Sequence, residues 1–110
     1  HYGRIRRPLL GIRYVIVDDR LKEKMNLPVS YGALIMKETP KDHGIVPESP
    51  ADKAGLKERD IVLECNSEKV DKDHPIQDFL EDLEVGDKME LLVQRGAKQF
   101  KVRVILAERK

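Results

Sequence analysis

The stretch ESPADKAGLKERDIVLECN, residues 48–66, carries the strongest local structure signals in the chain. It opens on a helix start made of Ser49, Pro50 and Asp52. Serine accepts hydrogen bonds from the free amides of a first helical turn, proline suits the first helical position, and aspartate is favoured at the positive end of the helix dipole. Gly55 suits the end of the same helix, which is therefore very short.

The residues after this helix begin a pattern of strands. In residues 60–65, Ile61, Leu63 and Cys65 alternate with Val62 and Glu64, which predicts a strand whose first set of side chains faces inward. Residues 12–17 and 31–36 are expected to be strands as well. Residues 88–94 and 99–106 are expected to form a hairpin around residues 95–98. One apolar face of that hairpin would hold Phe100, Val102, Val104 and Leu106.

Two more helices are expected. Residues 19–26 place Leu21 and Met25 at roughly helical spacing among charged residues, and Pro28 prevents the helix from continuing. After Pro75, apolar side chains recur at the spacing i, i+3, i+4, i+7 that gives a helix one apolar face. These side chains are Ile76, Phe79, Leu80 and Leu83. Residues 37–47, with two prolines and a glycine, are expected to be a long loop.

Length and charge limit the kinds of partner. The chain has 110 residues, the usual size of one domain with a single hydrophobic core. Its 21 Lys and Arg against 20 Asp and Glu give a net charge of +1, too little to attract a polyanion or an acidic membrane surface. Only 5% of the residues are aromatic and none is Trp, so the stacking platform of a single-strand binder is missing. We therefore expect no nucleic-acid partner and no direct membrane binding.

The residues that could carry chemistry have structural explanations. Ser49 is explained as a helix cap and Cys65 as a buried thiol that packs like a small hydrophobic residue. No serine lies in a recognisable nucleophile motif such as a Gly-x-Ser-x-Gly turn. The three histidines lack the spacing of metal ligands, and the single cysteine does not help them. The sequence thus predicts no catalytic residues, no metal and no cofactor, so the chain is not expected to be an enzyme.

A glycine between apolar residues has a different explanation. In PLLGI, residues 8–12, Gly11 stands where a loop enters a strand, shortly after Arg6 and Arg7. A glycine there lets the backbone bend so that successive amides point into one concavity, which is an anion-binding nest. Most such tripeptides are only strand entrances, so this signal needs support from elsewhere in the chain.

That support comes from a family resemblance. Residues 48–66, together with GALI at residues 32–35, resemble the most recognisable part of bacterial PDZ domains. With RPLLGI at residues 7–12, the chain is similar to the PDZ module that follows the protease domain in HtrA-type serine proteases. The resemblance covers nearly the whole chain. It implies that residues 1–7 are a linker from a preceding domain and that residues 8–108 are the PDZ domain.

The resemblance also implies a fold. That fold is mainly β with short helices, a partly open antiparallel β-barrel capped by two to three helices. It has the bacterial strand order, in which the strand that leads the animal-type domain comes last, here residues 99–106. The sequence departs from the family pattern at three places. Arg59 and Ser67 stand where glycine is common, and the loop at residues 37–47 is longer than usual.

The implied site is a peptide groove. PDZ domains bind the C-terminal end of a peptide as an extra strand and hold its carboxylate on backbone amides of a loop. Carried over to this chain, that loop is Leu9, Leu10, Gly11 and Ile12. The groove is Arg13, Tyr14, Val15 and Ile16 on the strand, with Ile76, Leu80 and Leu83 on the facing helix. Arg6 or Arg7 would add charge near the carboxylate.

The implied ligands end in an apolar residue. An apolar residue is also expected two positions earlier, because Ile76 stands where many PDZ domains use a histidine to select a hydroxyl. His74 is the rival for that position.

The implied function is a regulatory or substrate-tethering module of an HtrA-like serine protease. Its partners would be C-terminal peptides and the protease domain of the same parent chain. A PDZ module of a membrane metalloprotease or of a C-terminal processing protease, a free-standing adaptor and a structural spacer remain alternatives. The chain alone indicates no compartment, and an HtrA-like parent would place it in the bacterial cell envelope, periplasmic or otherwise extracytoplasmic.

Overall fold

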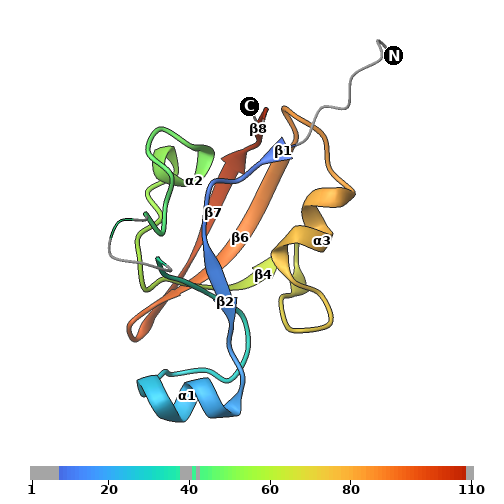
Figure 1. Cartoon of the computed structure of the whole chain (residues 1–110). Helices are drawn as coiled ribbons and strands as arrows, with labels where there is room; N and C mark the ends of the chain where they lie inside the picture. Colours follow the sequence, from blue (N-terminus) through green and yellow to red (C-terminus); the bar gives the residue numbers. More distant parts are fainter. Residues whose placement is uncertain (1–7, 38–40, 42, 109–110) are drawn as a thin grey trace.

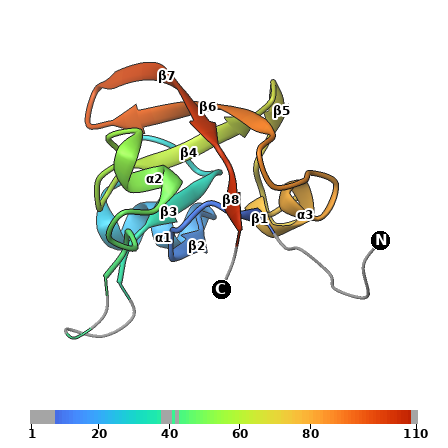
Figure 2. The ribbon, with the colours of Figure 1, turned by 90° about the horizontal axis from the view of Figure 1, so that it is seen from above.

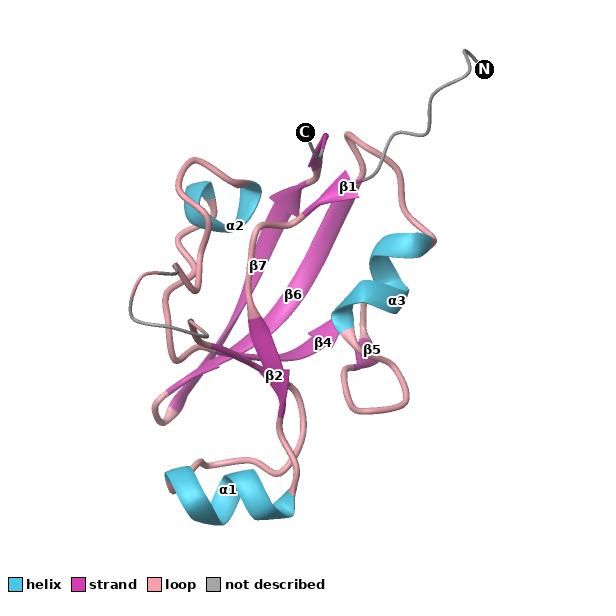
Figure 3. Ribbon diagram, in the orientation of Figure 1, coloured by secondary structure: helices cyan, strands magenta, loops and turns pink. Residues whose placement is uncertain are grey.

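The structure, a computed structural model, describes residues 8–37, 41 and 43–108. Its strands are β1 (Pro8–Leu9), β2 (Tyr14–Ile16), β3 (Ala33–Ile35), β4 (Ile61–Cys65), β5 (Glu68–Lys69), β6 (Lys88–Arg95), β7 (Lys98–Ile105) and β8 (Ala107–Glu108). Its helices are α1 (Asp19–Met25), α2 (Pro50–Lys53) and α3 (Ile76–Glu81). Figures 1 and 3 show the three helices around the strands. Within the described part of the chain, no helix is long and apolar enough to cross a membrane.

An open antiparallel sheet forms the centre of the fold. Its strand order is β2-β3-β4-β6-β7, and β5 pairs with β4 beside that path. A separate two-stranded sheet joins β1 to β8. Figure 2 shows β8 beside β1, with α3 on the other side of β1. The mainly antiparallel β fold with short helices that the sequence predicted is confirmed, and the pairs β1–β8 and β4–β5 are additions that it did not predict.

The helix starts follow the local sequence. The Ser49 hydroxyl accepts from the Asp52 amide at 3.3 Å, and the Asp52 carboxylate accepts in return from the Glu48 amide at 2.8 Å. The first bond satisfies an otherwise unpaired amide of the helix start, which confirms the capping role expected for Ser49, and the second fixes the residue before the cap. At α1, the Asp18 carboxylate accepts from the Leu21 amide at 2.8 Å.

The strand β4 is buried on both faces, which corrects one expectation. Val62, expected to face away from the core, is 0% exposed, as is Cys65. Both belong to the main apolar cluster, while Ile61 and Leu63 belong to a second cluster beneath α1 and the segment after it. The pairing of β4 with β6 shifts between Val62 and Glu64, and such a bulge moves Cys65 onto the face of Val62. Simple alternation was therefore the wrong model for this strand.

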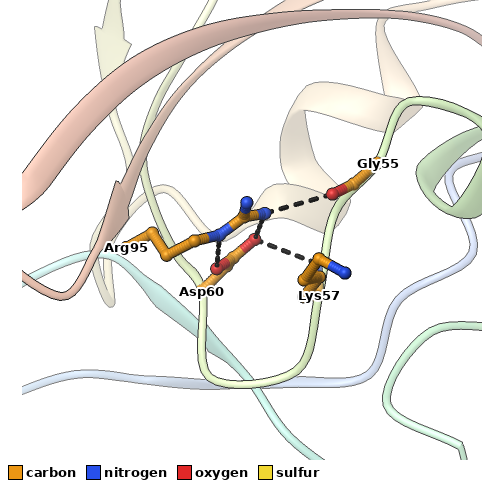
Figure 4. Close-up of polar contacts among 4 residues, drawn as sticks. All are labelled: Gly55, Lys57, Asp60 and Arg95. Carbon is orange, nitrogen blue, oxygen red and sulfur yellow. Dashed lines mark hydrogen bonds and ion pairs between the residues drawn. The ribbon is translucent and has the colours of Figure 1, made fainter.

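An ion pair between the partly exposed Arg95 and the buried Asp60 ties the β6–β7 hairpin to the chain after α2 (Figure 4). The Asp60 side chain, 2% exposed, accepts from Arg95 Nε at 2.8 Å and Nη2 at 2.7 Å, and from the Lys57 amide at 2.9 Å. Arg95 Nη2 also donates to the Gly55 carbonyl at 3.1 Å. The two parallel hydrogen bonds fix the guanidinium in one orientation.

The backbone before and after β4 has left-handed residues where the family pattern has glycine. Arg59 has φ 78° and Ser67 has φ 70°. Both angles lie in the region that side chains disfavour and glycine adopts freely. The turns at Arg59 and Ser67 therefore need a left-handed backbone, although neither residue is glycine.

Candidate functional site

The segment from Leu9 to Ile12 has unused backbone donors. Leu9 pairs with Ala107 of β8, while the carbonyls of Leu10 and Gly11 accept from the amides of Ala51 at 3.0 Å and Val46 at 2.8 Å. The amides of Leu10, Gly11 and Ile12 take part in no hydrogen bond among the described residues. Backbone donors are almost always paired in folded proteins, so three successive donors without a protein acceptor form a place where an anion can bind.

Gly11 is required at this position for two reasons. Its φ is +91°, and a Cβ there would lie closer than 3.0 Å to both Cβ and Oγ of Ser49. Ser49 is itself 4% exposed and cannot move aside without losing its place at the start of α2. The loop therefore packs directly against the capping residue that the sequence identifies most clearly.

Residues 43–46, in the second half of the long loop, pair with the backbone of residues 11–13. Ile12 and Ile45 form an isolated antiparallel bridge, with the Arg13 amide donating to the Gly44 carbonyl at 2.8 Å. Arg13 Nη1 also donates to the His43 carbonyl at 2.7 Å. Residues 38–40 and 42 of the loop lie outside the described residues. Residues 43–46 thus hold the entrance to β2, a role that the sequence did not reveal.

One edge of β2 is open. The Val17 amide donates to the Gly32 carbonyl at 2.9 Å and the Arg13 carbonyl accepts from Met36 at 3.0 Å, so residues 13, 15 and 17 direct their backbone groups toward β3. In a strand the direction alternates, so Ile12, Tyr14 and Ile16 direct theirs toward the opposite edge. There β2 is the outermost strand of its sheet. Such an edge is a template for another strand.

The side chains above that edge are apolar. Ile12, Tyr14 and Ile16 are half-buried and pack on the main core, whereas Arg13 and Val15 are exposed on the other face. From α3 and the turn after it, Phe79, Leu80 and Leu83 pack half-buried on the same core. The Tyr14 hydroxyl accepts from the Gln77 amide at 3.2 Å and so links β2 to the first turn of α3. Burial raises the pKa of Tyr14, so the phenol is neutral at physiological pH.

A strand edge, three amides with no acceptor among the described residues, and an apolar helix face therefore lie together. A sequence model of the family described as PDZ domain matches residues 8–106. The chain belongs to the PDZ domain family. The resemblance found in the sequence is confirmed.

Similar regions occur in proteins named as periplasmic serine endoproteases. The chain is 32% identical over 107 residues to a probable periplasmic serine endoprotease, DegP-like, of Marinomonas sp. (strain MWYL1), covering 97% of this chain and 21% of that protein. It is 26% identical over 107 residues to the periplasmic serine endoprotease DegP of Escherichia coli (strain K12), with 97% and 21% covered. The chain thus spans about a fifth of the length of these curated relatives.

Solved structures share the fold. The PDZ domain of HtrA3 bound to a phage-derived ligand (FGRWV) matches with a TM-score of 0.76 and 20% identity, over 96% of this chain and 89% of that one. The HtrA-type protease AlgW with a decapeptide matches with a TM-score of 0.76 and 18% identity, over 99% of this chain and 31% of that one. The fold of this chain is therefore that of PDZ domains of the HtrA type.

Of the residues expected in the groove, Tyr14, Ile16, Leu80 and Leu83 pack on the same core, whereas Arg13 and Val15 are exposed on the other face of β2. Leu10 and Ile76 are each 1% exposed, so their side chains lie in the core beneath the site and not on its surface. Leu80 and Leu83 keep part of their surface. Arg6 and Arg7 lie outside the described residues. His74 is exposed, and its backbone amide and carbonyl close a turn with Asp71.

Sequence reasoning missed one contributor to the site and one contact within it. Ser49, identified only as a cap, also fixes the space around Gly11. Tyr14 was assigned to the groove, but its bond to Gln77, 63 residues away, has no signal in the sequence.

The groups that could carry other chemistry are enclosed or scattered. Cys65 is 0% exposed, and burial raises its pKa to about 12, so the thiol carries no nucleophilic thiolate at neutral pH. Within residues 8–37, 41 and 43–108, no group of three His, Cys, Asp or Glu side chains is placed to hold a metal ion.

Proposed function

We propose that this PDZ domain captures the C-terminal ends of polypeptides by adding them as a strand to the open edge of β2. The observation that carries the proposal is the row of amides at Leu10, Gly11 and Ile12, which have no acceptor in the described part of the chain and lie where that edge begins. A peptide carboxylate on these amides would form charge-assisted hydrogen bonds, and the outward backbone groups of Tyr14 and Ile16 would continue the pairing.

The proposal implies one register for the peptide. With the carboxylate on the loop, the last peptide residue lies opposite Ile12 and the residue two positions earlier lies opposite Tyr14. The pocket for the last side chain is then lined by Ile12, Tyr14 and Leu83, with the buried Leu10 beneath them and Leu80 further along. These side chains are apolar or aromatic, which favours a peptide ending in Val, Leu or Phe.

The expected affinity is modest. Main-chain hydrogen bonds are available to any sequence, so the carboxylate and the last side chain must supply most of the discrimination. We expect a dissociation constant on the order of micromolar, which corresponds to about −8 kcal/mol.

The relatives support a place for the domain within a larger protein. Chains named as periplasmic serine endoproteases contain a region 26% to 32% identical to it. The parent protein is then a DegP-like serine endopeptidase of the bacterial periplasm, and this domain regulates it or tethers its substrates. The protease domain of that parent would be the second partner.

Calorimetric titration tests the peptide proposal. A peptide ending in Val or Leu should bind, and its C-terminally amidated twin should bind at least tenfold more weakly, because the charge on the nest is gone. Leu83→Glu, which places a carboxylate at the pocket, should also weaken binding. Leu21→Glu is the matched control, because Leu21 is a half-buried leucine on α1 that packs on the second cluster. Absence of binding of the acid peptide at millimolar concentration would leave the domain as a structural spacer.

A further inference from the structure

The contact between Tyr14 and α3 crosses the proposed groove. The phenol oxygen starts from β2 and accepts from the Gln77 amide at 3.2 Å, in the first turn of α3. The residue that precedes this helix, Pro75, offers no side-chain cap. Helix-start amides need an acceptor, so Tyr14 supplies for α3 what Ser49 supplies for α2. The ring therefore spans from the sheet edge to the helix and is held at its far end.

The helix end of this contact is fixed as well. Ile76, next to Gln77, is 1% exposed and anchored in the main core, so the first turn of α3 cannot shift freely away from β2. The aromatic ring is half-buried and packs against the same cluster. Removing the ring from its place costs the hydrogen bond and the packing together.

A peptide added to β2 would meet this ring at one position. Tyr14 directs its backbone groups to the open edge, so the peptide residue opposite it forms a hydrogen-bonded pair with it. Side chains of directly opposed residues in an antiparallel pair lie on the same face, close together. In the register proposed above, that residue stands two positions before the C-terminus. Its side chain must then share the space between β2 and α3 with the Tyr14 ring.

We propose that Tyr14 is the residue that sets selectivity two positions before the peptide C-terminus, favouring a small side chain there by filling the space with its tethered ring. This inference rests on the proposed peptide binding. It replaces the apolar preference expected from Ile76, whose side chain lies within the core. A small residue such as Ala leaves the Tyr14–Gln77 bond in place. A bulky residue such as Leu must displace the ring.

The test uses two peptides that share an apolar last residue and differ only in Ala or Leu two positions earlier, each with an amidated twin. The native chain should bind the Ala peptide about tenfold more tightly, the scale of a misfit of a few methylene groups. Tyr14→Ala should abolish or reverse this preference. Tyr14→Phe keeps the ring but loses the tether, so the preference should fall to about threefold, the worth of one neutral hydrogen bond. Tyr31→Phe is the control, because Tyr31 is a half-buried tyrosine of the second cluster.

A measurement without peptide guards against loss of folding. Amide hydrogen exchange at Gln77 should be about tenfold faster in Tyr14→Phe than in the native chain or Tyr31→Phe, because the amide has lost its acceptor. An unchanged exchange rate at Gln77 would overturn the tether. If acid peptides bind and amidated peptides do not, but the Ala and Leu peptides bind alike or the preference survives Tyr14→Ala, the inference fails and the proposed function stands. If no acid peptide binds, both fail together.

Discussion

The packing of Gly11 against Ser49 gives a prediction whose magnitude follows from the structure. Gly11→Ala adds a Cβ in a backbone with φ +91° and places it closer than 3.0 Å to Ser49 Cβ and Oγ. The left-handed backbone alone costs about 1 to 2 kcal/mol for a residue with a side chain. Forcing an extra carbon into a filled site costs about 1 to 3 kcal/mol more. We expect the free energy of unfolding to fall by about 3 kcal/mol.

Gly86→Ala separates the two contributions. Gly86 has nearly the same φ, +93°, but a Cβ there meets no atom within 4 Å. This variant should lose only the backbone part, about 1 kcal/mol. The double variant Gly11→Ala with Ser49→Gly removes the obstructing atoms, and a glycine cap costs only a few tenths of a kcal/mol, so it should recover most of the excess loss of Gly11→Ala.

Urea denaturation followed by far-UV circular dichroism measures all four chains. Equal losses in Gly11→Ala and Gly86→Ala, or a double variant no more stable than Gly11→Ala, would refute the close packing of the loop on Ser49. In that case Ser49 would not hold the loop from Leu9 to Ile12 in place.

Three further predictions test other parts of the fold. Arg59→Gly should raise the melting temperature by about 4 °C, because a left-handed residue with φ 78° is relieved of about 1 kcal/mol of strain; an unchanged or lower value by calorimetry would contradict this. Arg95→Met should lower the midpoint of urea denaturation, since it leaves the 2% exposed Asp60 carboxylate without its main partner. Lys101→Met removes an exposed pair at 3.8 Å and should change the free energy of unfolding by no more than about 0.5 kcal/mol, so equal midpoints for the two variants would contradict a structural role for the Asp60 pair. Burial raises the pKa of Cys65 to about 12, so at pH 8 the thiol should react with a thiol reagent about 100-fold more slowly in the folded chain than in urea, and equal labelling rates would contradict the burial. The free energy of unfolding should also fall as the pH rises above the thiol's ordinary pKa of 9.0, because only the unfolded chain then loses the proton.

The sequence predicted local structure correctly where a residue's role depends only on its near neighbours in the chain. The cap at Ser49, the end of α2 before Gly55 and the apolar spacing of α3 all arise from interactions within a few residues. The missing glycines at Arg59 and Ser67 pointed to turns that do have positive φ.

Pairings between distant segments were beyond local reasoning. The strands β1, β5 and β8 have two residues each, too few to show a period. The alternation in β4 failed because both faces of the strand are buried and a bulge shifts its register. The bridge from Ile45 to Ile12 and the bond from Gln77 to Tyr14 join segments 33 and 63 residues apart, and only the folded chain reveals them.

The most direct test of the central claim is a nuclear magnetic resonance titration of the ¹⁵N-labelled chain with an apolar-ended peptide and with its amidated twin. The acid peptide should shift the amide signals of Leu10, Gly11 and Ile12 most strongly, followed by Tyr14 and Ile16 along the edge of β2, and the amidated peptide should leave the first three nearly unchanged at the same concentration. Signals that move equally with both peptides, or that move on another surface while Gly11 stays fixed, would contradict the account.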